Sequence, residues 1–409
     1  LEIDPRLVGM LVALAVIWGG FDLLSGGAFL TPRNLWNISV QTAPIAIMAC
    51  GMVLVIVTRN IDLSVGSMLG FVGMIVGVAQ ARWLPEVIGL EHPATAPIAV
   101  LVGVTLGGAL GFLQGVLIAW FGIPSFIVTL GGLLVWRGAA WWVTQGQTVA
   151  PMDGAFRALG GGIEGAVGAN ASWALAALGC AGIVAGMIAL RRRRLRFGFP
   201  VRPPWAEGAV MGLACLAVLG AVTVANAYPL PPGVARRVVE AAGGTWAPGT
   251  FIPHGLALPV IVAIGVGIAM TVLATRTRFG RYVFAIGGNP EAAELSGINT
   301  RRTLALVFAL MGALTGLAAC IATARLNAAT NAAGTLDELY VIAAAVIGGT
   351  SLAGGLGSIA GAMLGALLMQ SLQSGMVLLG VDTPLQNIVV GLVLVVAVWL
   401  DGTWRKRIR

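Results

Sequence analysis

The sequence predicts an all-α protein that crosses a lipid bilayer many times. Of its 409 residues 58% are hydrophobic and only 10% are charged, which is too little charge to cover a water-soluble globule of this size. Apolar stretches of about 20 residues, the length that crosses the hydrocarbon core as a helix, recur along the chain. They are continuous and do not alternate between apolar and polar residues, so a membrane β-barrel is excluded.

Twelve stretches qualify as candidate spans. They are residues 7–25, 38–58, 63–81, 97–120, 124–144, 170–190, 207–228, 253–275, 302–324, 338–356, 357–380 and 384–401. The first has no small-residue cleavage site, so we expect a span there and not a secretory leader. Because the 59 glycines let membrane helices approach closely, we expect about 10 to 12 helices in a tight bundle that forms one membrane domain over residues 1–409.

Four hydrophilic segments interrupt the apolar stretches. Residues 145–169 and 229–252 are rich in glycine and proline, whereas 191–206 and 276–302 are rich in arginine. If the spans alternate from a cytoplasmic N-terminus, most basic residues fall on the cytoplasmic side, as membrane topology requires. We therefore expect both termini and both basic segments in the cytoplasm, with Arg59 the least certain, and the other two segments outside. Topology explains the net charge of +8 better than a nucleic-acid partner does.

The basic segment 276–302 contains the signature of a short helix. Asn289 is a good N-cap, and Pro290 suits the first helical position because its missing N–H has no partner there. Gly297 can adopt the left-handed conformation that ends a helix. The pattern predicts a helix from Pro290 to Ser296, followed by this glycine cap.

So short a helix needs a surface to lie on, since isolated helices below about 12 residues are marginal in water. Ala292 and Leu295 share one face, while Glu291 and Glu294 lie near the positive end of the helix dipole. This arrangement suits a groove on another protein. A solvated connecting helix is the alternative.

Four motifs in this chain resemble those of the monosaccharide permeases of bacterial ABC importers, the ribose, galactose and xylose type. They are Gly287–Ile298 (GGNPEAAELSGI), Asn60–Ser67 (NIDLSVGS), Gly122–Gly131 (GIPSFIVTLG) and Ala343–Ser358 (AAAVIGGTSLAGGLGS). Within that family, Ser371–Asn387 looks most like the xylose-type member. The chain departs from the family at Asn60, where a glycine is usual, at Thr335–Leu339, and in an extra helical pair around 170–228. These departures bear more on the identity of the sugar than on the class of protein.

The resemblance implies partners and a coupling site. It implies a separate ATPase subunit with two nucleotide-binding halves that uses ATP and Mg²⁺, a periplasmic sugar-binding protein, a second permease copy, and a bacterial inner-membrane location. This chain would bind no cofactor: its only lysine is Lys406, and no P-loop can be built on it. The ATPase-coupling residues would be Gly288, Asn289, Pro290, Glu291, Ala292, Glu294, Leu295 and Gly297.

Polar residues inside the apolar stretches or at their edges are candidates for a sugar pathway, which needs hydroxyl, amide and aromatic groups. They are Asn60, Asp62, Ser64, Ser67, Ser125, Thr129 and Trp136, with Gln114, Thr350, Ser351 and Gln370 as weaker candidates. Asp62 is either a gate or a structural carboxylate paired with Arg59 or a helix N-terminus. Trp136 either stacks on a sugar or belongs to the interfacial aromatic belt, and we expect Arg137 to extend its head to water near the outer boundary.

Asp62–Ser67 and Ser351–Ser358 each lead into a glycine-rich apolar run. They fit an internal repeat with broken helices, or two unrelated turns. The four cysteines and two histidines are isolated, so we expect no metal site and no catalytic site. The competing functions are an ion-coupled secondary sugar transporter, a polytopic membrane enzyme, and an ABC permease for ribose, galactose or branched-chain amino acids.

Overall fold

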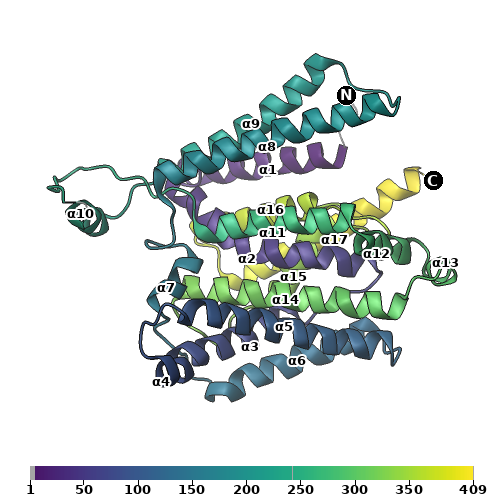
Figure 1. Cartoon of the computed structure of the whole chain (residues 1–409), viewed down its shortest axis with the longest axis horizontal. Helices are drawn as coiled ribbons and strands as arrows, with labels where there is room; N and C mark the ends of the chain where they lie inside the picture. The colour runs from purple at the N-terminus through teal and green to yellow at the C-terminus, as the bar shows by residue number, and fades with distance from the viewer. Residues whose placement is uncertain (1–4, 242, 409) are drawn as a thin grey trace.

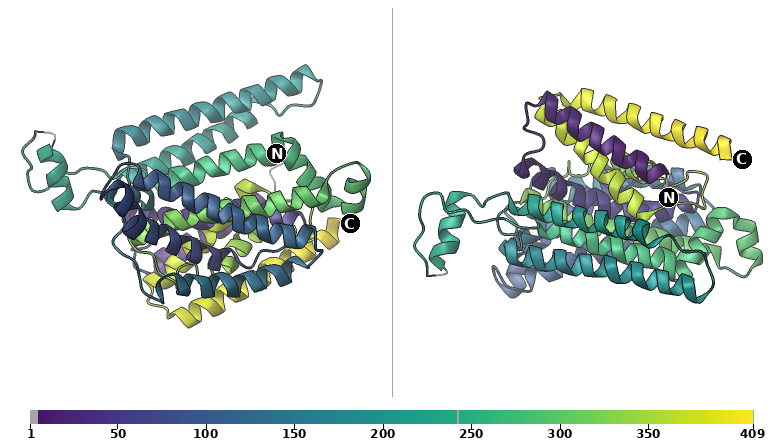
Figure 2. Two further views of the ribbon diagram at one scale, coloured as in Figure 1. Left: turned by 60° about the horizontal axis from the view of Figure 1, so that its bottom comes forward. Right: turned by 90° about the horizontal axis from the view of Figure 1, so that it is seen from above.

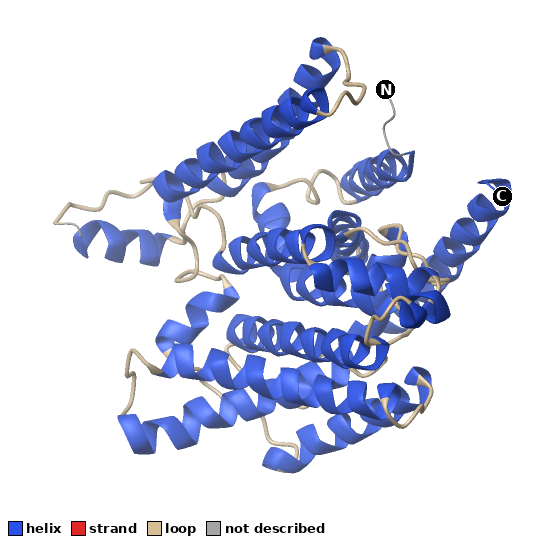
Figure 3. Ribbon diagram, turned by 45° about the vertical axis from the view of Figure 1, so that its right-hand side comes forward, coloured by secondary structure: helices blue, strands red, loops and turns tan. Residues whose placement is uncertain are grey.

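The regular structure is helical, as the sequence predicts. The computed structural model describes residues 5–241 and 243–408, and within them it contains helices and four isolated β-bridges but no strand (Figure 3). Ten helical segments in this part of the chain are long and apolar enough to span a membrane. They are α1 (Pro5–Leu24), α2 (Pro32–Val57), α3 (Val65–Val78) with η1 (Ala79–Trp83) and α4 (Leu84–Ile88), α5 (Thr95–Ala119), α6 (Ser125–Thr144), α8 (Gly168–Arg196), α9 (Pro204–Asn226), α11 (Leu258–Arg276), α14 (Thr300–Leu326) and α16 (Ile359–Leu378).

The remaining elements are short or lie near the C-terminus. They are α7 (Gly154–Arg157), η2 (Ala158–Gly160), α10 (Pro232–Ala241), α12 (Arg278–Gly288), α13 (Pro290–Leu295), α15 (Asp337–Ile347) and α17 (Thr383–Ile408). The predicted span 384–401 lies in α17, although some side chains beyond Val396 are outside the described residues.

The predicted span 338–356 is wrong as a continuous helix. α15 has 11 residues. At about 1.5 Å per residue it reaches roughly half of the ~30 Å hydrocarbon core. The chain then turns through Gly349, Gly354 and Gly355, whose positive φ angles of 89°, 86° and 76° are incompatible with a helix. A half-helix and a glycine-rich loop therefore occupy this stretch.

The two ends of the bundle differ in charge. The start of α1, the α8–α9 turn, α12, α13 and the end of α17 lie at one end, which we call the basic end because it carries the arginines of 191–202 and 276–302 (Figures 1 and 2). α4, α7 and α10 lie at the opposite end. Both arginine-rich segments thus share one side of the bundle, as their charge predicts.

Glycines bring two central helices into close contact. Gly103, Gly107, Gly111 and Gly115 recur every fourth residue of α5 and face α14. A Cβ at Gly107 would lie 2.2 Å from the carbonyl oxygen of Gly312. Two backbones can meet at this spacing only without side chains, so the predicted tight glycine-rich packing is confirmed at this crossing.

An aromatic cluster ties α2 to the loops at the opposite end. The ring of His254 lies 4.7 Å from that of Tyr228 and 4.8 Å from that of Trp36, and its Nε2 lies 3.1 Å from the carbonyl oxygen of Gly162. Trp36 Nε1 donates to the carbonyl oxygen of Gly255. Burial lowers the pKa of the His254 imidazole below its usual 6.5, against the weaker opposing effect of backbone hydrogen bonds. The neutral imidazole is therefore the form that this cluster favours.

Candidate functional site

The helix predicted in the basic segment 276–302 is α13, and both of its caps are confirmed. The Asn289 side chain accepts a hydrogen bond of 3.0 Å from the Ala292 backbone N–H, and Pro290 occupies the first turn. Gly297 has a φ of 81° and its N–H donates to the carbonyl oxygen of Glu294. The helix ends at Leu295, one residue before the predicted boundary, because Ser296 already leaves the helical conformation.

α13 projects from the basic end with little covering it (Figure 1). Leu295 is 90% exposed, although a leucine contributes most when buried. Glu291, Ala292 and Glu294 are also exposed, whereas Ala293 packs inward. The outer face of α13 therefore offers one large apolar side chain flanked by carboxylates.

The base of this segment forms a junction with two other loops. Arg59 donates from Nε to the carbonyl oxygen of Gly287 over 2.9 Å and from Nη2 to that of Gly288 over 2.7 Å. The Gly355 N–H donates to the carbonyl oxygen of Val57 over 3.0 Å. A Cβ at Gly287 would collide with that same carbonyl, so only glycine fits. Arg59 is thus at the basic end, and it links the α2–α3 loop directly to the segment 276–302.

Asp62 is buried just before the start of α3 and bonds to the residue that precedes this helix. Its Oδ1 accepts hydrogen bonds from the backbone N–H and the hydroxyl of Ser64, the residue before α3, at 2.9 and 2.6 Å. Gln114 of α5 donates to the Ser64 hydroxyl over 2.9 Å. Asp62 does not pair with Arg59, which bonds elsewhere. Of the two structural pairings weighed for Asp62, the one with Arg59 is absent, and the carboxylate lies beside the N-terminus of α3 with its hydrogen bonds made to Ser64.

The N-termini of α3 and α15 meet within the bundle. A Cβ at Gly66 would lie 2.3 Å from the carbonyl oxygen of Gly334, and the Glu338 carboxylate also approaches it. Arg137 of α6 donates from Nη1 to the carbonyl oxygens of Asn331 and Ala333 over 2.8 and 2.9 Å. The expectation that Arg137 reaches outward to water is therefore wrong. Its guanidinium satisfies carbonyls of the turns before α15, which have no helical partners.

The other predicted pathway residues are mostly packed inside. Ser67 and Thr129 are fully buried and bond to backbone carbonyls. Trp136 stacks on Phe71 with ring centroids 5.8 Å apart, so its indole packs within the protein. Ser125 is half-buried at the start of α6, and Asn60 donates to the carbonyl oxygen of Thr58. Thr350 and Ser351 are completely buried in the loop after α15.

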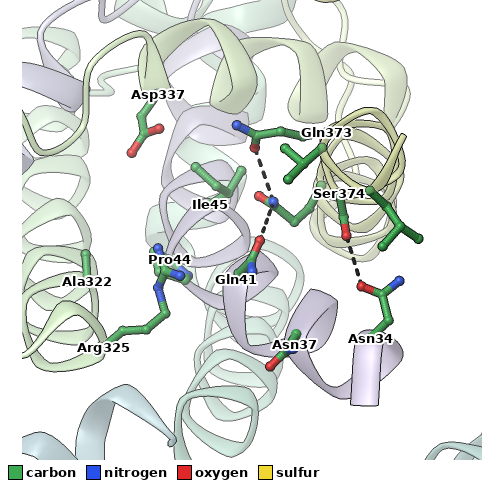
Figure 4. A pocket seen from close by; sticks show the side chains of 13 residues that line it. Asn34, Asn37, Gln41, Pro44, Ile45, Ala322, Arg325, Asp337, Gln373 and Ser374 are labelled. Carbon is green, nitrogen blue, oxygen red and sulfur yellow. Dashed lines mark hydrogen bonds between the residues drawn. The ribbon is translucent and has the colours of Figure 1, made fainter. Parts of the chain in front are cut away.

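A polar cavity lies elsewhere, between α2, α14, α15 and α16 (Figure 4). Its volume is about 350 Å³, within the range of small-molecule sites. Five carboxamides line it: Asn34, Asn37, Gln41, Gln370 and Gln373. They belong to the first three turns of α2 and the last three of α16, so the cavity lies in the half of the bundle away from the basic end.

Sequence analysis missed most of this cavity. Of the eleven pathway candidates only Gln370, one of the four weaker ones, lines it. A signal was present, however. Asn34, Asn37 and Gln41 are spaced three and four residues apart, so they share one helical face, and Gln370 and Gln373 do so on α16.

The sequence of this chain is similar to those of known membrane transport proteins. Residues 34–398 match the model of the family described as branched-chain amino acid transport system / permease component. The chain belongs to this family.

Two groups of transport proteins are similar over nearly the whole chain. The xylose transport system permease protein XylH of Escherichia coli strain K12 is 38% identical over 99% of this chain and 94% of its own length. The XylH protein of Haemophilus influenzae is 36% identical over 99% of this chain and 98% of its own length. The ribose import permease protein RbsC of Escherichia coli K12 is 33% identical over 98% of this chain and 93% of its own length. No solved structure matches. The chain is therefore a multi-pass membrane permease, and its predicted family is confirmed.

Proposed function

We propose that this chain is the membrane-spanning subunit of an ATP-driven importer that moves a monosaccharide, a xylose-like pentose, into the cytoplasm. The observation that carries the proposal is α13: a six-residue capped helix with an almost fully exposed leucine, at the basic end of a chain similar over its length to sugar permeases. A separate ATPase subunit receives this helix in a groove. The basic end faces the cytoplasm, since arginines are retained on that side.

The other parts of the assembly follow from the same proposal. A soluble sugar-binding protein docks at the opposite end, where α4, α7 and α10 lie. Two copies of the chain form one importer in a bacterial inner membrane. Exposed Leu295 is the apolar anchor for the ATPase, while Glu291 and Glu294 complement basic groups around its groove. The ATPase binds ATP and Mg²⁺, and this chain binds neither.

Reconstitution tests this function directly. The chain is placed in liposomes with its ATPase and binding protein, and uptake of labelled xylose, ribose, galactose and leucine is measured with and without ATP. We expect ATP-dependent uptake of xylose above the other compounds. Leucine uptake would support the branched-chain amino acid activity named by the family description. Uptake driven by a proton or sodium gradient without ATPase would overturn the proposal.

A matched pair of variants tests the coupling helix. Glu294→Arg reverses an exposed charge on α13, and we expect it to prevent copurification of the ATPase. Glu86→Arg makes the same change on exposed α4 at the opposite end and should leave copurification unchanged. Normal copurification with both variants would show that α13 is only a connecting helix.

A further inference from the structure

The polar cavity between α2 and α16 contains hydrogen-bonding groups that the protein leaves unused. Gln370 is 7% exposed and donates to the side-chain oxygens of Gln41 and Gln373 over 3.0 and 3.2 Å, which orients all three amides (Figure 4). The NH₂ groups of Asn37, Gln41 and Gln373 donate to no residue in the described part of the chain. They are left as donors to whatever occupies the cavity.

Two opposite charges lie on the other side of the same cavity. Asp337, the first residue of α15, and Arg325, near the end of α14, both line it (Figure 4). Neither side chain forms an ion pair or hydrogen bond with another described residue. A carboxylate accepts hydrogen bonds at both oxygens, and a guanidinium donates several in a fixed plane. Held apart, they offer an acceptor and a donor to a neutral molecule lying between them.

These groups together match a polyhydroxylated neutral ligand. Each sugar hydroxyl both donates and accepts, so it needs partners of both kinds in a fixed arrangement. Amides on α2 and α16 provide them on one wall, and Asp337 and Arg325 on the other. A cavity built for an apolar amino acid would instead be lined mainly by apolar side chains.

We propose that this cavity is a monosaccharide-binding site of the permease itself, entered from the side opposite the basic end, and that it contributes to sugar selection inside the membrane. The inference rests on the proposed function and locates a contact site for the sugar. Selection is then shared between the membrane subunit and the soluble binding protein. It differs from a water-filled vestibule, through which a sugar would pass without specific contacts.

The first test measures transport by cavity variants in the complete reconstituted complex. Gln41→Ala removes an amide, and Asp337→Asn keeps the shape of the side chain while removing its charge. We expect both to retain the ATPase and its stimulation by the loaded binding protein, while xylose uptake per ATP hydrolysed falls about tenfold. Gln147→Ala changes an exposed glutamine between α6 and α7 and should leave uptake unchanged.

A second test does not depend on how well these variants fold. Asn37→Cys is purified in the full complex, reconstituted, and treated from outside with a membrane-impermeant maleimide. Labelling should abolish uptake, and Gln147→Cys labelled in the same way should remain active, with the untreated complexes and the labelled native chain as controls.

The outcomes separate the two proposals. If the wild-type complex imports xylose but the cavity variants and labelled Asn37→Cys do so within twofold of normal, the binding site is wrong and the proposed function stands. If the wild-type complex imports no sugar, the proposed function itself fails. If Gln41→Ala and Asp337→Asn lose binding-protein-stimulated ATPase together with uptake while labelled Asn37→Cys stays active, the residues support folding and not sugar binding.

Discussion

Two pairs of helices that are equally apolar have opposite positions in the fold. In α2 and α14, 94% and 67% of the most apolar stretch is buried inside the protein, against 6% and 11% in α8 and α9. The α8–α9 hairpin packs mainly on itself and forms one edge of the molecule (Figures 1 and 3). Hydropathy finds a span but does not show whether lipid or protein surrounds it. We expect close contact with neighbouring helix backbones to distinguish the buried helices from the α8–α9 hairpin. Substitutions in the two regions can test this.

Glycine substitutions should give the largest difference in stability between the central helices and the α8–α9 hairpin. Gly111→Ala in α5 places a Cβ 2.1 Å from the carbonyl oxygen of Phe308, so α5 and α14 must separate. Overpacking of this kind costs about 3 kcal/mol. Gly182→Ala in α8 meets nothing within 4 Å and should stabilise that helix slightly. Melting temperatures in detergent would measure both, and equal shifts would mean that the central crossing is no tighter than the hairpin.

Removing a polar contact should also cost more stability in the bundle than in the α8–α9 hairpin, although the difference is smaller than for the glycines. Arg137→Leu deprives the partly buried carbonyls of Asn331 and Ala333 of their donor, which costs about 1.5 kcal/mol. Glu207→Gln weakens the ion pair with Arg191 that joins α8 to α9, where both side chains are partly exposed. That change should cost below about 1 kcal/mol. A greater loss of thermal stability for Glu207→Gln would reverse the comparison.

Arginines at the basic end extend the comparison to activity. Arg59→Ala removes the two hydrogen bonds to the coupling segment, and we expect uptake to fall about tenfold while the ATPase still copurifies. Arg193→Ala, an exposed arginine of α8 at the same end, should not change uptake. If both variants transport normally, the Arg59 junction does not transmit movement from α13.

The smallest effect is a pH dependence at the opposite end. Burial holds the pKa of His254 below the 6.5 of the unfolded chain, so the unfolded state binds more protons in the interval between the two values. The contribution to stability is present above about pH 6.5 and is lost as pH falls through the folded-state pKa. His254→Phe should therefore show a smaller decrease in melting temperature between pH 7.5 and 5.5. Identical decreases would exclude His254 as a contributor.

Local patterns in the sequence predicted local structure well. Asn289, Pro290 and Gly297 define α13 because caps depend on neighbours along the chain. The apolar stretches located the spans for the same reason. The α15 half-helix was missed because composition alone does not distinguish a helix from a glycine-rich loop that continues it.

The polar cavity required knowledge of which helices are neighbours. Each wall carries polar residues at helical spacing, but only the packing of α2 beside α16 brings Gln41 to Gln370. Likewise, Arg325 and Asp337 are separated in sequence by a segment that folds back into the bundle. An internal repeat and a second copy of the chain remain predictions.

The shortness of α15 has a consequence for how the protein is made. A newly synthesised segment partitions into lipid on its own only if its apolar length and its charges permit, and this one has 11 residues beginning with Asp337 and Glu338. It is too short and too charged to insert into the bilayer as an independent helix during synthesis. Its stable position depends on packing against α2 and α16, and α16 is synthesised after it. We therefore expect α15 to take its place only after α16 is made, and substitutions where α15 packs on α2 and α16 to impair assembly before they impair transport.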